Sequence, residues 1–291
     1  MTHSATDTSS ISFTAHYTGY VWYLQRWSSP AFVTRQGRLY HFLMQPLEQL
    51  ARGLIGQNVQ TTLITRHALL DRELQRNIDA GHTQVLELAC GLSPRGWSLR
   101  QRHPHLLYVE ADLPAMAAHK QRLLAGLDVD ASQHRVVSCN ILEESGPLSL
   151  ESVLSTHFDR TRPITVISEG LVNYFRRDTI AAVWSRLGQA LHAFPAACYL
   201  TDNYVELTQH PMAAVIRQAN RWLALATRSS FTLHFRDAQE AEQQFLACGF
   251  EHLQYLDPQQ ELTASALPRA RGESLVRVVR ASIGEDIQPT R

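Results

Sequence analysis

The feature that most constrains the fold of this chain is an alternation of short apolar and amphipathic segments that begins near residue 85. The apolar runs indicate buried strands, and they cover residues 85–89, 106–109, 135–139, 164–168 and 197–201. Most segments between them repeat apolar side chains at steps of three and four, which is typical of helices. Strands that alternate with helices form a parallel sheet covered on both faces, so the sequence predicts an α/β fold.

The segments on either side of this alternation differ from it. A polar tail and three helices are predicted before the first strand, and the helices cover residues 13–27, 46–55 and 61–78. The first of them is rich in aromatic residues, which either pack on the core or cover a flat ligand. We therefore expect a helical cap over residues 1–80 and an α/β core over 81–281.

After the fifth strand the alternation pauses. A helical pattern over residues 208–227 indicates an insertion at about 203–235 rather than a crossover between strands. Two final strands, at 251–256 and 274–281, have little helical signal between them and should form an antiparallel hairpin. We expect residues 282–291 to form a C-terminal tail.

Charge and composition argue against several classes of protein. The 27 basic and 27 acidic residues cancel, whereas a nucleic-acid binder needs a basic surplus. No stretch approaches the roughly 18 apolar residues of a membrane span, and residues 1–12 are polar rather than basic and then apolar, so we expect no signal peptide. The four cysteines form no CxxC pair and the 14 histidines form no HExxH motif. We therefore expect a cytoplasmic protein without a metal, a membrane or a nucleic-acid partner, and we leave its oligomeric state open.

The turn after the first strand indicates what kind of ligand the sheet binds. In open α/β sheets the ligand lies beyond the carboxyl ends of the strands. The segment from Glu87 to Gly96 has glycines only at Gly91 and Gly96, and Pro94 has no N–H to donate. It therefore lacks the GxGxxG pattern whose N–H groups bind a pyrophosphate, and a phosphate-free ligand fits better.

Acidic residues near the ends of the first two strands favour S-adenosylmethionine as this ligand. It carries a sulfonium cation, an amino acid end and a ribose diol. Glu87 lies in the first strand, and Glu110 and Asp112 end the second, about twenty residues past the turn, where a carboxylate can accept both ribose hydroxyls. Any one of these acids could instead cap a helix or pair with an arginine. After the third strand, Asn140 and Ile141 offer an amide and an apolar wall for adenine.

Several motifs together resemble the leucine carboxyl methyltransferase family, and most closely its bacterial branch associated with O-methylation in polyketide biosynthesis. They are VLELACGLSPRGW, YVEADLPAMAAHKQRLL, the segment EGLVNYF that is similar to the family's EGLxxYL signature, and an RHxxxD element that starts at Arg66. The resemblance covers roughly residues 60–200. It implies a class I methyltransferase fold, with a Rossmann-like seven-stranded sheet whose last strand is antiparallel.

The resemblance also implies a role for individual residues. Arg66 would hold the cofactor carboxylate, Gly91 would touch the methionine part, and Glu169 would face the amino group. Asp112 would bind the ribose, and Asn140 and Ile141 the adenine. The family often has Asp at position 140, but an amide both donates and accepts hydrogen bonds, so binding should survive. Cys90, at an often small position, is expected to be an apolar filler.

These features predict an S-adenosylmethionine-dependent O-methyltransferase that acts on a carboxyl or hydroxyl group of a small, polyketide-like molecule. A carboxylate is ionised at pH 7 and needs no base, whereas a phenol would benefit from one. His210, His234 and Tyr204 are candidate catalytic groups. Tyr174, Tyr204 and Arg176 are candidates for binding the acceptor, although packing or surface roles compete for each of them.

Three other functions stay open at this point. The first is methylation of a protein's C-terminal carboxyl group, and the second is a nicotinamide-dependent oxidoreductase of Rossmann type. The third is a non-catalytic protein that binds the cofactor.

Overall fold

The fold is built around one mixed sheet. The computed structural model describes residues 8–55, 58–127, 129–205, 232–263, 267–268 and 274–284. Its seven strands have the order β3-β2-β1-β4-β5-β7-β6. They are β1 (Gln84–Leu88), β2 (Leu107–Asp112), β3 (His134–Ser138), β4 (Ile164–Ser168), β5 (Ala197–Tyr204), β6 (His252–Leu256) and β7 (Val276–Ile283). The first five are parallel, and β7 runs antiparallel between β5 and β6, which confirms the predicted sheet and its antiparallel last strand.

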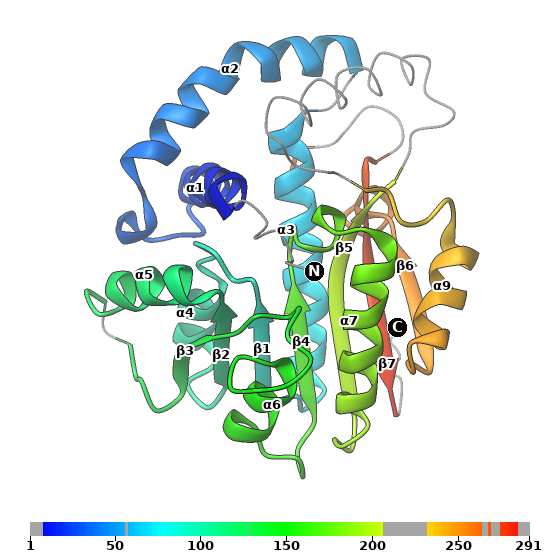
Figure 1. Cartoon of the computed structure of the whole chain (residues 1–291). Coiled ribbons are helices and arrows are strands. Elements are labelled where there is room, and N and C mark those ends of the chain that lie inside the picture. The colour runs from blue at the N-terminus through cyan, green and yellow to red at the C-terminus, as the bar shows by residue number, and fades with distance from the viewer. Residues whose placement is uncertain are drawn as a thin grey trace, which may run out of the picture.

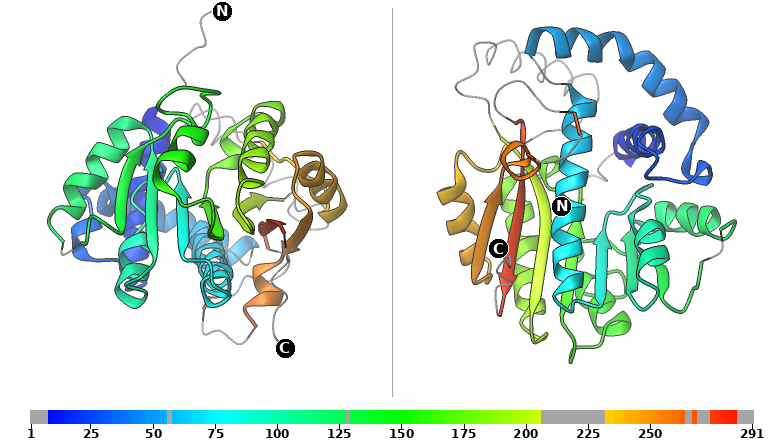
Figure 2. Two further views of the ribbon diagram at one scale, coloured as in Figure 1. Left: turned by 90° about the horizontal axis from the view of Figure 1, so that it is seen from below. Right: turned by 180° about the vertical axis from the view of Figure 1, so that it is seen from behind.

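Helices cover both faces of this sheet (Figures 1 and 2). One face carries α3 (Val59–Asp79), α4 (Arg95–Arg102) and α5 (Pro114–Leu124), and the other carries α6 (Leu150–His157), α7 (Arg177–Leu191) and α9 (Ala238–Ala247). The side chains of successive residues in a strand point to opposite faces of the sheet. In β1, Val85 packs with the leucines of α3, whereas Leu86 and Leu88 pack with α6 and α7. All five β1 residues are buried, as expected for a central parallel strand.

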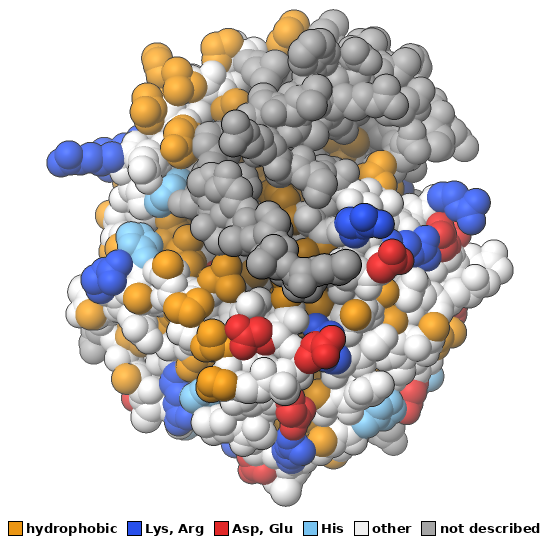
Figure 3. Space-filling model, viewed as in Figure 1, with side chains coloured by type: hydrophobic (Ala, Val, Ile, Leu, Met, Phe, Trp, Pro, Cys, Tyr) orange, Lys and Arg blue, Asp and Glu red, His pale blue; other side chains and the backbone are white. Residues whose placement is uncertain are grey.

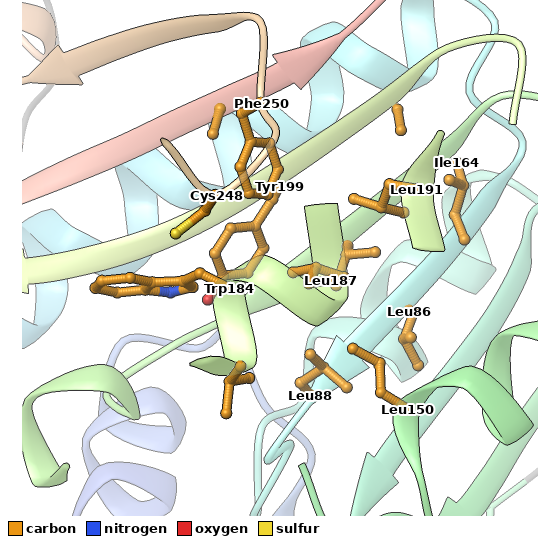
Figure 4. Packing of buried hydrophobic residues seen from close by; sticks show 14 of the residues in the cluster. Leu86, Leu88, Leu150, Ile164, Trp184, Leu187, Leu191, Tyr199, Cys248 and Phe250 are labelled. Atoms are coloured by element: carbon orange, nitrogen blue, oxygen red, sulfur yellow. The ribbon is translucent and has the colours of Figure 1, made fainter. Parts of the chain in front are cut away.

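The larger core cluster includes Trp184 of α7 and Tyr199 of β5 (Figure 4). The Trp184 ring lies 4.7 Å from the Phe245 ring, and Tyr199 stacks on Phe250 at 6.1 Å. Helix α7 comes close to the end of α9 because it has a glycine there. A Cβ at Gly188 would overlap the carbonyl oxygen of Cys248.

The N-terminal helices lie across the upper end of the parallel strands in Figure 1. They are α1 (Thr8–Leu24), the 3-10 turn η1 (Pro30–Phe32) and α2 (Arg35–Ile55). A Cβ at Gly19 of α1 would lie 3.2 Å from the Leu92 Cβ, so α1 rests on the turn that follows β1. Helix α2 packs on α1, where the Tyr17 hydroxyl donates to Glu48 Oε1 over 3.1 Å.

The outer side of α2 is apolar and exposed. In Figure 3 orange side chains gather over this helix at the upper left. The exposed members are Leu39, Phe42, Leu43 and Leu50. In the described part of the chain no helix is long and apolar enough to cross a membrane.

The strand predictions agree with the structure to within about three residues, and the helix predictions fail at three places. Helix α2 starts at Arg35 and continues through Pro46, where the sequence suggested a start. Proline at an exposed helix position removes one hydrogen bond and bends the helix, and Figure 1 shows α2 following an arc. Helix α6 and the short α10 (Pro258–Glu261) were not predicted. The predicted insertion falls mostly on residues 206–231, which lie outside the described residues.

Candidate cofactor site

The first half of the site is the turn between β1 and α4, which is tied to the end of β2. Gly91 has a positive φ of 48°, a conformation that favours glycine. Its N–H donates to Asp112 Oδ2 over 2.8 Å, and the Leu113 N–H donates to Oδ1 over 2.8 Å. Burial raises the pKa of Asp112 above its usual value, although these two N–H groups offset part of that increase. Each oxygen keeps a lone pair, so the carboxylate can still accept two hydroxyl groups of a ligand.

The second half lies at the ends of β4 and β5, where Arg66 reaches over from α3. Its Nε donates to Glu169 Oε1 over 3.0 Å, and its Nη1 donates to Asp202 Oδ2 over 3.2 Å. The guanidinium is buried, and burial lowers its pKa, but the charges of Asp202 and Glu169 outweigh this and raise it. Among the described residues no hydrogen bond uses Arg66 Nη2, so this nitrogen can donate to a ligand carboxylate.

A second buried arginine, Arg95 of α4, connects the two halves. Its three nitrogens each donate over 2.5 Å, Nε to Asp71, Nη1 to Glu87 and Nη2 to Glu169. Burial raises the pKa of Glu169, but the charges of His67 and of both arginines hold it well below its usual range. Because both oxygens of Glu169 have protein partners, a ligand amino group would be a further partner.

Aromatic rings of the cap cover this ion-pair network. Trp22 stacks on the His67 ring at 4.2 Å and Trp27 at 5.3 Å. His67 Nδ1 lies 2.7 Å from Glu169 Oε2. The aromatic helix therefore packs on the protein core at this point, as the simpler of the two interpretations of the sequence expected.

Two of the three acidic residues predicted near the strand ends do not reach the edge of the sheet. Glu87 is buried, and its Oε2 accepts the Tyr108 hydroxyl over 2.8 Å. Glu110 is fully buried with Lys120 Nζ at 2.6 Å and His134 Nε2 at 3.1 Å. Glu110 lies two positions before Asp112 in β2. Its side chain therefore points to the same face of the sheet as that of Asp112, but it starts further from the strand end. We therefore place only Asp112 of the three at the candidate site.

The loop after β3 is held by its own hydrogen bonds. Asn140 Oδ1 accepts the Leu142 N–H over 3.2 Å, and the Asn140 N–H donates to the Leu148 carbonyl over 2.8 Å. Ile141 packs against the main core, and its carbonyl accepts from Arg186 over 2.9 Å. Both predicted adenine residues thus lie in an ordered loop at the carboxyl edge. Cys90, in the turn after β1, is buried, and burial raises the pKa of its thiol.

The candidates on the acceptor side fall into different surroundings. The Tyr204 hydroxyl accepts from Arg66 Nη1 over 3.4 Å, and burial raises the pKa of Tyr204 to about 12. Tyr174 is half-buried at the end of η2 (Val172–Tyr174), whereas Arg176 is exposed. His234 Nε2 donates to the Val172 carbonyl over 2.9 Å against the Trp184 ring, and burial lowers the pKa of His234. His210 lies outside the described residues.

The structure therefore joins Gly91 with Asp112, and Arg66 with Glu169 and Tyr204. It also adds Asp202 and Arg95, to which the sequence analysis gave no role. An acidic residue directly after the apolar run 197–201 was the available signal for Asp202, because strand ends form the site edge. A guanidinium nitrogen without a partner among the described residues, a carboxylate with spare lone pairs and a glycine at the turn suit a ligand with a carboxylate, a diol and no phosphate.

A family model described as "Leucine carboxyl methyltransferase" matches residues 28–188, just over half of the chain. A protein of Parafrankia sp. (strain EAN1pec), named as a candidate S-adenosyl-L-methionine-dependent methyltransferase, is 28% identical over 149 residues. The alignment spans 51% of this chain and 46% of that protein, so it covers about half the length of the curated relative.

Two solved structures share the fold. A DUF574 family protein from Streptomyces avermitilis is 16% identical, with a TM-score of 0.62 over 92% of this chain and 95% of that one. A candidate methyltransferase from Thermobifida fusca is 18% identical, with a TM-score of 0.55 over 87% and 90% of the two chains. At these identities the likeness supports the fold and not a shared acceptor.

Proposed function

Because this chain belongs to the leucine carboxyl methyltransferase family, whose cofactor is S-adenosylmethionine, we propose that it transfers a methyl group to an oxygen atom of a small-molecule acceptor. The observation that carries the proposal is the pair of half-sites along one sheet edge. Asp112 with Gly91 would hold the ribose side of the cofactor, and Arg66 with Glu169 its amino acid end. Family membership also argues against the nicotinamide-dependent oxidoreductase.

When bound, the sulfonium group supplies a methyl group for an in-line displacement by the acceptor oxygen. The protein's part is to align the reacting atoms, and such positioning can contribute about 7–11 kcal/mol to lowering the barrier. Arg66 is suited to this because its guanidinium is already fixed by two carboxylates. Asp112 is suited because two backbone N–H groups fix its carboxylate.

A carboxylate acceptor matches the described groups better than a hydroxyl acceptor. With a pKa of about 12, Tyr204 keeps its proton at neutral pH and cannot accept another. His234 Nδ1 is buried and has no hydrogen-bond partner in the described part of the chain, so an acceptor would have to reach into the core to use it. An ionised carboxylate attacks without a base.

The test is calorimetry of the purified, cofactor-stripped protein with S-adenosylmethionine and S-adenosylhomocysteine. We expect both ligands to bind. Failure of either one to bind would overturn the proposal. Panels of small carboxylic acids and phenols with a methyl-labelled cofactor would then separate the two acceptor classes. For a carboxylate acceptor the rate of methyl transfer should stay flat between pH 6 and 9, whereas a base-assisted hydroxyl acceptor should give a rising limb.

The remaining alternatives predict different results in the same assay. A protein-carboxyl methyltransferase would label a peptide with a free C-terminal carboxyl group and no small acid. A non-catalytic binding protein would bind the cofactor and never release S-adenosylhomocysteine, even with cell extract as a source of acceptors.

A further inference from the structure

Asp202 of β5 is a fully buried carboxylate at the edge that carries the candidate site. Its two oxygens serve different partners. Oδ1 accepts the Gly170 N–H over 2.6 Å, and Oδ2 accepts Arg66 Nη1 over 3.2 Å. Burial raises the pKa of Asp202 above its usual value, and the charge of Arg66 and the Gly170 N–H offset part of that increase. Leaving a buried charge without partners is strongly unfavourable, so these two bonds fix where the carboxylate and its partners lie.

The donors of Arg66 are divided between protein and ligand. A guanidinium has five N–H donors in a rigid planar fork. Nε donates to Glu169, and Nη1 donates to Asp202 and to the Tyr204 hydroxyl. Nη2 donates to no described residue, so its direction toward a ligand is set by the bonds that the other two nitrogens make.

Gly170 supplies the surface on which this guanidinium lies. It has a positive φ of 65°, and a Cβ there would lie 3.2 Å from Arg66 Nη2 and 3.3 Å from Nη1. The peptide that must come this close is the one that Asp202 holds through its N–H. One carboxylate thus fixes both the plane of the guanidinium and the backbone beneath it.

We propose that Asp202 is a positioning residue that aims the Nη2 edge of Arg66 at the carboxylate of the bound cofactor. It acts through Arg66 and the Gly170 amide and does not touch the ligand itself. The inference rests on the proposed function, because it needs a cofactor that carries a carboxylate.

The test compares two ligands in two proteins. The ligands are S-adenosylhomocysteine and its decarboxylated analogue, which keeps the adenosine, the sulfur and the amine. In the wild-type protein the analogue should bind about tenfold or more weakly, as expected for the loss of a charge-assisted hydrogen bond. In Asp202→Asn this ratio should fall to about twofold or less, because Arg66 is no longer aimed at the carboxylate. A purely structural role for Asp202 would weaken both ligands alike and leave the ratio unchanged, which would overturn the proposal.

A matched control is Asp257→Asn, which also removes a carboxylate from an ion pair, here with Arg277 at 3.4 Å. Asp257 lies after β6 and outside the site, so the ligand ratio should stay at the wild-type value. If Asp202→Asn fails to fold, Gly170→Ala provides the test, because its Cβ presses on the same guanidinium with Asp202 intact. The ratio should fall in that variant too, and an unchanged ratio would refute the proposal. Failure of the wild-type protein to bind S-adenosylhomocysteine would instead reject the proposed function itself.

Discussion

At the scale of single residues, Asp112 makes the most direct prediction about the candidate site. Replacing it with alanine removes the acceptor proposed for the ribose hydroxyls. A charge-assisted hydrogen bond contributes about 1.5–3 kcal/mol, so Asp112→Ala should weaken cofactor binding at least about tenfold. Calorimetry would measure this, with Asp130→Asn as the control, because the Asp130 side chain is exposed and its partners among the described residues are Ser132 and, at 3.7 Å, Arg100. An unchanged affinity in Asp112→Ala would remove this residue from the ribose role.

His82 makes a prediction about stability and pH. It is buried with Nδ1 2.9 Å from the Thr165 hydroxyl, and burial together with the charge of Arg280 lowers its pKa to about 4. The unfolded chain therefore takes up a proton near pH 6.5, well before the folded chain does. The stabilisation by the neutral ring is present above pH 6.5 and is lost as the pH falls toward 4.

Between pH 7.5 and pH 5 this linkage should lower the free energy of unfolding by about 2 kcal/mol. In His82→Asn that part of the pH dependence should vanish, whereas the exposed His252→Asn should keep it. Urea titrations at both pH values would check the prediction. Equal slopes in the wild type and in His82→Asn would contradict it.

At this scale the sequence predicted the chemical type of the candidate site residues better than it predicted their contacts. Gly91 and Asp112 meet as the strand-end rule predicts. Glu87 and Glu110 have the same chemistry, but they serve buried cations from α4 and α5. The position of an acid along its strand decides between these outcomes. One residue of uncertainty in a predicted strand end is enough to confuse them.

At the scale of elements, the strands were predicted well because each is a short buried run with a clear boundary. Helix α6 was missed because its eight residues carry only three buried apolar side chains, Leu150, Val153 and Leu154. Helix α2 was cut short because Pro46 usually marks a helix start. Here the proline is exposed, so packing of α2 on α1 outweighs the loss of one hydrogen bond.

Two glycines in helices test the packing between elements. Gly188→Ala in α7 should lower the free energy of unfolding by about 2 kcal/mol, because its Cβ would overlap the Cys248 carbonyl and push the two helices apart. Gly53→Ala in α2 should raise it by about 0.5 kcal/mol, because nothing lies within 4 Å and the unfolded chain loses freedom. Denaturant unfolding of both variants would measure the pair. An unchanged or raised free energy of unfolding in Gly188→Ala would contradict the close contact of α7 with the end of α9.

At the scale of the whole molecule, the cap and the sheet share the candidate site. Helix α1 rests on the Gly91 turn, since a Cβ at Gly91 would lie 3.4 Å from the Ala15 Cβ, and Trp22 covers His67 beside Glu169. The alternation of strands and helices predicted the sheet, and the aromatic residues of the first helix indicated packing on the core, but no local pattern showed that α1 would lie on the Gly91 turn. Such a contact depends on tertiary packing between segments about 70 residues apart, which periodicity does not report.

This arrangement predicts that cofactor binding stabilises the cap as well as the sheet. S-adenosylhomocysteine at about 100 times its dissociation constant should raise the free energy of unfolding by about 2.7 kcal/mol. Hydrogen exchange measured with and without this ligand should show added protection in α1 and in the turn before α4. The amides of α9, at the far edge of the sheet, provide the internal control. Protection of the turn without protection of α1 would contradict the shared site.

The contacts of Arg66 also bear on how the chain is made. Its two carboxylate partners follow it by 103 and 136 positions. During synthesis, which proceeds from the N-terminus, the arginine leaves the ribosome long before β5 exists. The candidate site therefore cannot be complete in a nascent chain until Asp202 has emerged. Ligand binding to ribosome-bound chains of increasing length would show at which chain length the candidate site is complete.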